Sequence, residues 1–323
     1  MRVWTFYFFC LLSMLLIPEL GHGFVDVRAQ LAKIPKDDQQ DLETFFRALF
    51  KEGFGYTLFG DKPLTIASWH GQPQWIYLFN SQPHLVRIRT GWATWKKYEH
   101  LFSNAHYKLY RTHFSQEFSG TIHEVGMINR RACLRTLEQH RCLFNAVFSS
   151  SELAEKRLAS LEKGQPSFTS QPDLLGILLG YGAKNAQVFA EESQLFDRLI
   201  QLPGFPNAAP KSFDEAPVHV QQSITLNMHI GPASPGSLQC RCVHEYSDCL
   251  QRYCELQASG QTTTKRFPKS PLCPIAPPHF GIYNNSSETQ LLLENYTRDR
   301  RVIMEVFKSD QFLELVLDRY CNG

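Results

Sequence analysis

The first 23 residues constrain this chain most, because they decide the chemical environment in which the rest must fold. A basic start, Met1-Arg2, leads into an apolar run from Val3 to Ile17, which Pro18 and Gly21-His22-Gly23 close. This is the layout of a secretory signal peptide. The run of about 15 residues is shorter than the roughly 20 that a membrane-spanning helix needs. We therefore expect a periplasmic or secreted protein with residues 1–23 as a cleaved signal peptide; a retained signal anchor is the alternative.

The remaining residues, 24–323, are enough for one large domain or two ordinary ones. Hydrophobic residues make up 43% of the chain and aromatic residues 13%, which is typical of a globular protein with a substantial core. The net charge is only +2, whereas nucleic-acid binding usually needs a marked basic excess on one surface. We therefore expect no nucleic-acid partner and no transmembrane span after signal cleavage, and the sequence identifies no other partner.

Eight cysteines remain after the signal peptide, and an even number in an exported chain favours disulfides. The disulfide candidates are Cys133, Cys142, Cys240, Cys242, Cys249, Cys254, Cys273 and Cys321. Cys133 and Cys142 lie in one predicted helix, where a separation of nine residues places the sulfurs roughly 13 Å apart along the axis. We therefore expect long-range bridges that tie the 240–254 cluster to the rest of the chain. A zinc site in that cluster and free buried thiols are the alternatives, although Cys-x-Cys is not the usual zinc spacing.

Hydrophobic periodicity predicts an α+β fold, with a small antiparallel sheet in the N-terminal half and a mainly helical C-terminal half. Short β-prone runs between turn residues predict strands over 56–59, 64–69, 75–79, 85–88, 107–114 and 121–127. Apolar residues at helical spacing predict helices over 38–51, 92–102, 129–148, 152–163, 173–181, 184–201, 239–257, 288–307 and 309–321. We expect a single α+β domain over 24–323; if there were two, the boundary would fall near 164–172.

The segment from Gly53 to Pro63 is the first candidate site. Its glycines flank an aromatic run, and the turn that follows would place Asp61 and Lys62 at the mouth of a pocket. The simpler interpretation, which we favour, is a helix stop followed by a strand and a tight turn. A phosphate-binding loop is excluded, because Pro63 follows Lys62 where such a loop needs Ser or Thr.

The segment from Leu174 to Ala186 is the second candidate, because Gly180 and Gly182 precede a predicted helix. The backbone N–H groups at a helix start can capture an anion. The segment lacks the third glycine of a dinucleotide fingerprint and follows a helix rather than a strand. We therefore favour a corner between two helices, in which the glycines allow a close approach.

The sequence shows no catalytic or metal-binding motif, so we assign no catalytic, cofactor-binding or metal-ligating residue and no cofactor. It has no His-Glu-x-x-His helix and no Gly-x-Ser-x-Gly elbow. His100, His106, His113 and His123-Glu124 fall in one region, where a folded cluster could bind zinc. We favour scattered histidines over such a cluster.

Two of these segments resemble known proteins. Gly55-Tyr56-Thr57-Leu58-Phe59-Gly60-Asp61-Lys62-Pro63 and Leu175-Gly176-Ile177-Leu178-Leu179-Gly180-Tyr181-Gly182 with Asn185-Ala186 resemble stretches of uncharacterised exported proteins of chlamydiae and similar intracellular bacteria. The resemblance implies a Gram-negative envelope, and hence a periplasmic or secreted protein. It transfers no catalytic residue, and in such a host the sequons at Asn284, Asn285 and Asn295 would carry no glycan.

Two hypotheses about function follow from these observations. We favour a non-enzymatic, disulfide-supported exported protein that works by binding or by interaction with the envelope. The alternative is an envelope hydrolase or a thiol enzyme whose active site no motif reveals. Convergence of Asp61, Lys62, His123 and Glu124 in one pocket would favour the enzyme, and their dispersal would favour the binding protein.

Overall fold

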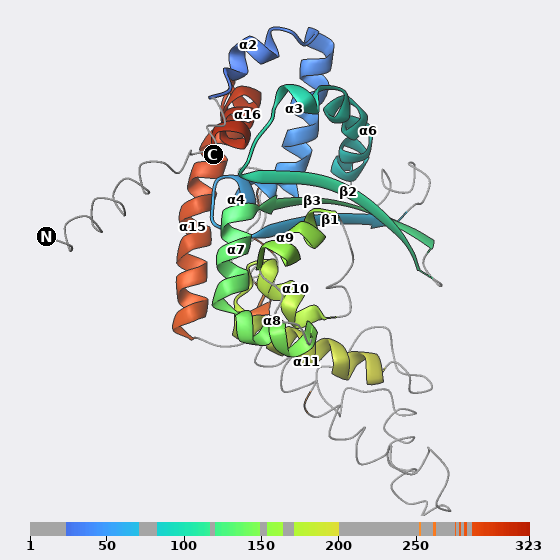
Figure 1. Cartoon of the computed structure of the whole chain (residues 1–323), viewed down its shortest axis with the longest axis vertical. Coiled ribbons are helices and arrows are strands. Elements are labelled where there is room, and N and C mark those ends of the chain that lie inside the picture. The colour runs from blue at the N-terminus through green and yellow to red at the C-terminus, as the bar shows by residue number, and fades with distance from the viewer. Residues whose placement is uncertain are drawn as a thin grey trace, which may run out of the picture.

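The computed structural model of the chain describes residues 24–70, 83–116, 120–148, 154–163, 171–199 and 286–323, together with 252, 261–262, 275, 278 and 281–282. Within these ranges a three-stranded antiparallel sheet lies between two groups of helices (Figure 1). Its strands, in spatial order, are β1 (Leu64–His70), β3 (Gly120–Asn129) and β2 (Tyr107–Gln116). A second, two-stranded sheet pairs β4 (Gln261–Thr262) with β5 (Gly281–Ile282). The predicted α+β class and the small antiparallel sheet are confirmed.

Helices from both ends of the described chain cover one face of the three-stranded sheet. They are α2 (Val27–Leu31), α3 (Lys36–Lys51), α6 (Pro83–Tyr98) with the 3-10 helix η1 (Glu99–Leu101), and α16 (Phe312–Asn322). As its sequence predicts, α3 buries an apolar stripe at helical spacing that includes Leu42, Phe45 and Leu49. Aromatic rings meet edge to face in this core, for example Phe46 and Trp95, whose centroids lie 5.3 Å apart. The phenylalanine-rich composition of the chain therefore serves packing.

The opposite face of the sheet is covered by helices from the middle of the chain. They are α7 (Arg130–Gln139), α8 (Arg141–Phe148), α9 (Ala154–Glu162), α10 (Pro172–Leu178) and α11 (Ala183–Leu199). Leu64 and Ile128 point to this side, whereas Ala67 and Met127 point to the aromatic core, as the alternation of a strand requires. The long helix α15 (Ser287–Lys308) runs beside the sheet past both groups (Figure 1). Residues from α15 can therefore reach sites built by either group.

The predicted strand at 56–59 is wrong, because residues 56–58 belong to the short helix α4 (Phe54–Leu58) and Phe59 caps its end. Gly53 has a φ of 85°, a left-handed conformation that ends α3 and lets a new helix begin at once. All five residues of α4 are buried. An apolar run that is covered on every side has no polar face, so its periodicity does not separate a helix from a strand.

The predicted strand at 85–88 is also wrong, because it forms the first part of α6. The β-branched residues Val86 and Ile88 favour a strand locally, but α6 packs closely on α3. A Cβ atom added at Gly91 would lie 2.6 Å from Cβ of Phe45, so the two helices touch at this glycine. The single helix predicted over 129–148 is two helices, α7 and α8, that meet at His140.

Other predicted features lie outside the described residues: the signal peptide at 1–23, the strand at 75–79, the helix at 239–257 apart from residue 252, and most of the boundary region at 164–172. The division of the chain into domains therefore stays a prediction. Across the ranges that the structure describes, no helix combines the length and the apolar character that crossing a membrane needs.

Candidate functional site

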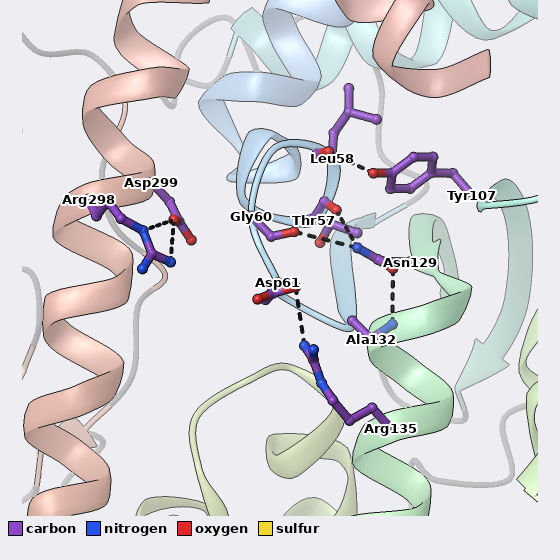
Figure 2. A network of polar contacts seen from close by, with 10 residues as sticks. All are labelled: Thr57, Leu58, Gly60, Asp61, Tyr107, Asn129, Ala132, Arg135, Arg298 and Asp299. Carbon is purple, nitrogen blue, oxygen red and sulfur yellow. Dashed lines mark hydrogen bonds and ion pairs between the residues drawn. The ribbon is translucent and has the colours of Figure 1, made fainter. Parts of the chain in front are cut away.

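A frame of hydrogen bonds from Asn129 fixes the turn that follows α4 (Figure 2). Asn129 ends β3, and its side-chain oxygen accepts from the N–H of Ala132 at 3.0 Å, which caps α7. Its side-chain nitrogen donates to the backbone oxygens of Thr57 at 3.2 Å and Gly60 at 3.5 Å. One buried side chain thus joins α4, the turn after it, β3 and α7. It holds in place residues 61–63 and α7, which line a pocket.

The pocket has a volume of about 440 Å³ and is lined by four parts of the chain. These are the turn at 61–63, the C-terminal end of α7 with His140, the corner between α10 and α11, and one face of α15. The polar and charged side chains in its lining include Asp61, Lys62, Arg135, His140, Glu288, Tyr296 and Asp299. The volume is within the range of small-molecule sites, which is about 300–1,000 Å³.

Lys62 is the most unusual residue of this pocket, because it is only 6% exposed. Its backbone N–H donates to the oxygen of Tyr56 at 3.3 Å, which fixes the position of the residue. Within the described part of the chain, no carboxylate or other acceptor pairs with its ammonium group. Burial lowers the pKa of Lys62 to about 7. At neutral pH the amine is therefore divided between its charged and neutral forms.

Two carboxylates of the pocket have contrasting environments (Figure 2). Asp299 on α15 has a side chain that is 8% exposed, and it accepts from two nitrogens of Arg298 at 3.2 and 3.3 Å. Burial is the main cause that raises the pKa of Asp299, and Asp61 raises it further. Asp61 is largely exposed and pairs with Arg135 of α7 at 3.2 Å. The pocket therefore has a buried carboxyl as well as a buried amine.

The corner between α10 and α11 approaches the pocket through two glycines. Gly180 and Gly182 have φ values of 76° and 82°, in the left-handed region that side chains disfavour. A Cβ atom at Gly180 would lie 2.5 Å from the hydroxyl of Tyr296 and 3.3 Å from Cγ of Lys62. The Tyr296 hydroxyl donates to the Gly180 oxygen at 2.6 Å. The predicted helix corner with a close approach is confirmed.

The start of α11 does not offer its backbone N–H groups to an external anion, because Glu288 of α15 already accepts from them. Its carboxylate accepts from the N–H of Ala183 at 2.9 Å and from that of Lys184 at 3.4 Å. These are the backbone groups that would bind a foreign anion at this helix start. A carboxylate of the chain itself therefore occupies the position.

The structure brings Asp61 and Lys62 together in the pocket but not His123 and Glu124. These two lie on β3, where His123 pairs across the strands with His113, and Glu124 accepts from the Tyr110 hydroxyl at 3.4 Å. Among the described residues, no group of three His, Cys, Asp or Glu side chains is arranged to hold a metal ion. The sequon residue Asn295 lines the pocket, whereas Asn284 and Asn285 lie outside the described residues.

Sequence reasoning missed the residues that α15 contributes. The polar residues Glu288, Asn295 and Asp299 lie at helical spacing, with Leu292 between the first two, so they share one face of this helix. That pattern of polar residues on one helix face was the available signal. It did not show which other part of the chain the face would meet.

Three of the eight cysteines lie in the described ranges, and each has a free thiol. Cys133 and Cys321 are buried, and burial raises the pKa of both thiols to about 12. Both are therefore protonated and poor nucleophiles at neutral pH, whereas Cys142 is exposed. Cys240, Cys242, Cys249, Cys254 and Cys273 lie outside the described residues, so the disulfides stay a prediction.

The pocket thus combines a buried amine, a buried carboxyl and an exposed ion pair at its rim. Such a site can bind a small polar ligand or transfer protons to it. Comparison of the chain with protein-family models, with curated proteins and with solved structures finds no match in any of the three.

Proposed function

We propose that this chain is an exported binding protein whose pocket around Lys62 holds a small zwitterionic ligand, such as a free amino acid or a short peptide. The observation that carries the proposal is the buried Lys62 amine, which the described chain leaves without a partner inside a cavity of about 440 Å³. A ligand carboxylate would supply the partner that burial makes necessary. Asp61 and Asp299, in the same lining, would attract the ligand's ammonium group.

The lowered pKa of Lys62 is a second argument for a ligand with an anionic group opposite this amine. Because burial lowers the pKa of Lys62 to about 7, the unliganded amine is largely neutral above that pH. A carboxylate beside it favours the charged form, so ligand binding draws a proton from solution. Affinity should therefore fall as pH rises above 7, with proton uptake on binding near pH 8.

Calorimetric titration of the full chain with a panel of free amino acids tests the proposal. Each amino acid is compared with the amine that lacks its carboxylate, at pH 7 in buffers of different ionisation enthalpy. We expect saturable binding of amino acids with proton uptake, and loss of at least about tenfold in affinity for the amines, because a hydrogen bond to a charged group contributes about 1.5–3 kcal/mol.

Lys62→Met is the decisive variant, because methionine keeps much of the apolar stem and removes the amine. It should abolish both the binding and the proton uptake. Lys36→Met, which changes an exposed lysine of α3, is the matched control and should bind as the wild type does. Equal binding by Lys62→Met and the wild type would overturn the proposal.

A lysine-dependent enzyme is the second candidate, and the pairing of a lowered amine pKa with a raised carboxyl pKa favours it. A neutral amine can attack a ketone or aldehyde carbon, form an imine and release water. Incubation with pyruvate and borohydride tests this step, because hydride reduces the imine to a stable secondary amine. A mass increase on the Lys62 peptide would support the enzyme, and an unmodified Lys62 would exclude this chemistry for pyruvate.

Export and disulfide support belong to the same proposal, and the apolar leader and the even number of cysteines favour them. Non-reducing peptide mapping of protein purified from its native compartment tests both. We expect the mature chain to begin at Phe24 and the cysteines of the 240–254 cluster to be paired. A retained N-terminus with free thiols would contradict export and disulfide support together.

A further inference from the structure

The Lys62 pocket is elongated along α15, and its two ends differ in character. Glu288 and Asp299 both line it from one face of this helix, and at about 1.5 Å per residue they lie roughly 16 Å apart along the helix axis. An extended chain covers at most about 3.6 Å per residue, so the charged groups of one amino acid reach only a fraction of this length. The pocket therefore has room for more than a charged ligand head.

The charged groups gather at the end of the pocket near Asp299. A Cβ atom added at Gly60 would overlap the Asp299 carboxylate, so the segment that carries Asp61 and Lys62 passes this point of α15. Lys62 lies near Tyr296, one turn before Asp299, because both contact the corner between α10 and α11 at the same glycine. Asp61 is close enough to raise the pKa of Asp299. A buried amine and two carboxylates therefore share one end of the pocket.

The other end of the pocket offers apolar surface. The corner between α10 and α11 reaches it at Gly182, where an added Cβ atom would lie 2.8 Å from Cδ1 of Leu292. Leu291 and Ile177 line the pocket as well, and the Glu288 carboxylate is already bonded to the start of α11. Leu291 is 58% exposed, so it presents apolar surface to solvent that a ligand would cover.

We infer that the ligand is a free amino acid with a large apolar side chain that extends from the charged end towards Leu291, an inference that rests on the proposed function. The carboxylate and the ammonium group of a free amino acid leave the same carbon, so both reach Lys62 and the carboxylates of that end together. The two charged termini of a peptide are separated by at least one peptide unit, so one of them would lie away from its partner. The apolar side chain then covers Leu291, and burial of both surfaces strengthens binding.

Calorimetric titration of the full chain at pH 7 with leucine, asparagine, glycine and the dipeptide glycylleucine tests this inference. Leucine and asparagine have side chains of nearly the same shape, so the difference between them isolates polarity. We expect leucine to bind at least about tenfold more tightly than the other three, because burial of a leucine side chain has an effect of this order. Gln139 and His140 line the pocket too, so a preference for asparagine would show that these polar side chains, rather than Leu291, meet the ligand, and would contradict the inference.

Leu291→Ser is the informative variant, because this leucine is exposed and lies outside both hydrophobic cores. It should weaken the binding of leucine at least about threefold and leave that of glycine unchanged. Leu315→Ser, at an exposed leucine of α16 outside the pocket lining, is the matched control and should bind both as the wild type does. Equal affinities for leucine, asparagine and glycine, tighter binding of the dipeptide, or unchanged leucine binding by Leu291→Ser would overturn this inference alone. Failure of every amino acid to bind would overturn the proposed function with it.

Discussion

The interior of the Lys62 pocket and its rim hold positive charge in different ways. In the interior, a single amine is buried without a partner in the described chain, and burial alone lowers its pKa to about 7. At the rim, the exposed side chain of Arg135 pairs with the exposed carboxylate of Asp61. The interior charge therefore carries a desolvation cost, whereas solvent and a partner stabilise the charge at the rim. Raising the pH from 7 towards 10.5 should reveal the first, and titration with salt the second.

The largest effect is expected from Lys62→Met on stability. The unfolded lysine has a pKa of 10.5 and the folded one a pKa of about 7, so between these values the unfolded state binds more protons. The free energy of unfolding of the wild type therefore rises with pH through this window. Lys62→Met removes this dependence and should stabilise the protein by roughly 4 kcal/mol at pH 7, given 1.36 kcal/mol per pKa unit.

Urea denaturation of both proteins at pH 7, 8.5 and 10 measures this difference. The gain from Lys62→Met should shrink steadily as pH rises towards 10.5. Lys36→Met, at an exposed position, should change stability by less than about 0.5 kcal/mol at every pH. A gain that stays constant with pH would mean that packing rather than charge separates the variant from the wild type.

The second prediction concerns the corner that closes the Lys62 pocket. Gly180→Ala places a Cβ atom in a left-handed backbone conformation and 2.5 Å from the Tyr296 hydroxyl. Strain and overpacking together should lower the free energy of unfolding by about 3 kcal/mol. Gly53→Ala separates the two causes, because Gly53 has a φ of 85° but its Cβ atom would meet nothing closer than 3.9 Å.

Gly53→Ala should therefore cost only the backbone term, about 1–2 kcal/mol, in the same denaturation experiment. Gly180→Ala should also weaken ligand binding at the pocket, because Tyr296 or Lys62 must move. Equal losses of stability in the two variants would show that the close approach to Tyr296 contributes nothing.

The sequence predicted helices and strands correctly where an element has one polar and one apolar face. It did not predict the type of element where all of its residues are buried or where local preference and packing disagree. The stripe of α3 and the alternation in β1, β2 and β3 were readable because each has one side turned to a core. In α4 every residue is buried, and in α6 the β-branched residues favour a strand until α3 packs against them. In both segments, packing against the rest of the protein determined the secondary structure, although the residues locally favour a strand.

The Lys62 pocket also depends on contacts between distant parts of the chain, which the sequence alone does not reveal. The corner at Gly180 was predicted as a local structure and exists. The tight turn predicted at Asp61 and Lys62 is instead an irregular segment, which the bond from the Lys62 N–H to the Tyr56 oxygen holds in place. Nothing local indicated that they line one cavity, because α15, which brings Tyr296 and Asp299 to it, comes from the far end of the chain. Whether a lysine after a tight turn is solvated or buried depends on such a long-range contact.

The third prediction tests the frame that fixes one wall of the Lys62 pocket. Asn129→Ala removes the cap of α7 and the bonds to the Thr57 and Gly60 oxygens, at a position that is 8% exposed. The free energy of unfolding should fall by about 2 kcal/mol, since a lost cap and unpaired buried groups add. Asp26→Ala, which removes the exposed cap of α2, should lower it by less than about 1 kcal/mol. Equal losses would mean that the bonds to the turn carry no stability.

The smallest effect belongs to the exposed ion pair at the rim of the Lys62 pocket. Arg135→Gln removes the partner of Asp61, so it should lower the free energy of unfolding by less than about 1 kcal/mol at low salt. This loss should vanish in about 1 M NaCl, where the Debye length is about 3 Å. The gain from Lys62→Met should persist in the same salt, because it arises from desolvation of a buried amine. A loss from Arg135→Gln that also persists in high salt would show that the rim pair does not stabilise the protein through its charge, and salt would then not distinguish the rim from the interior.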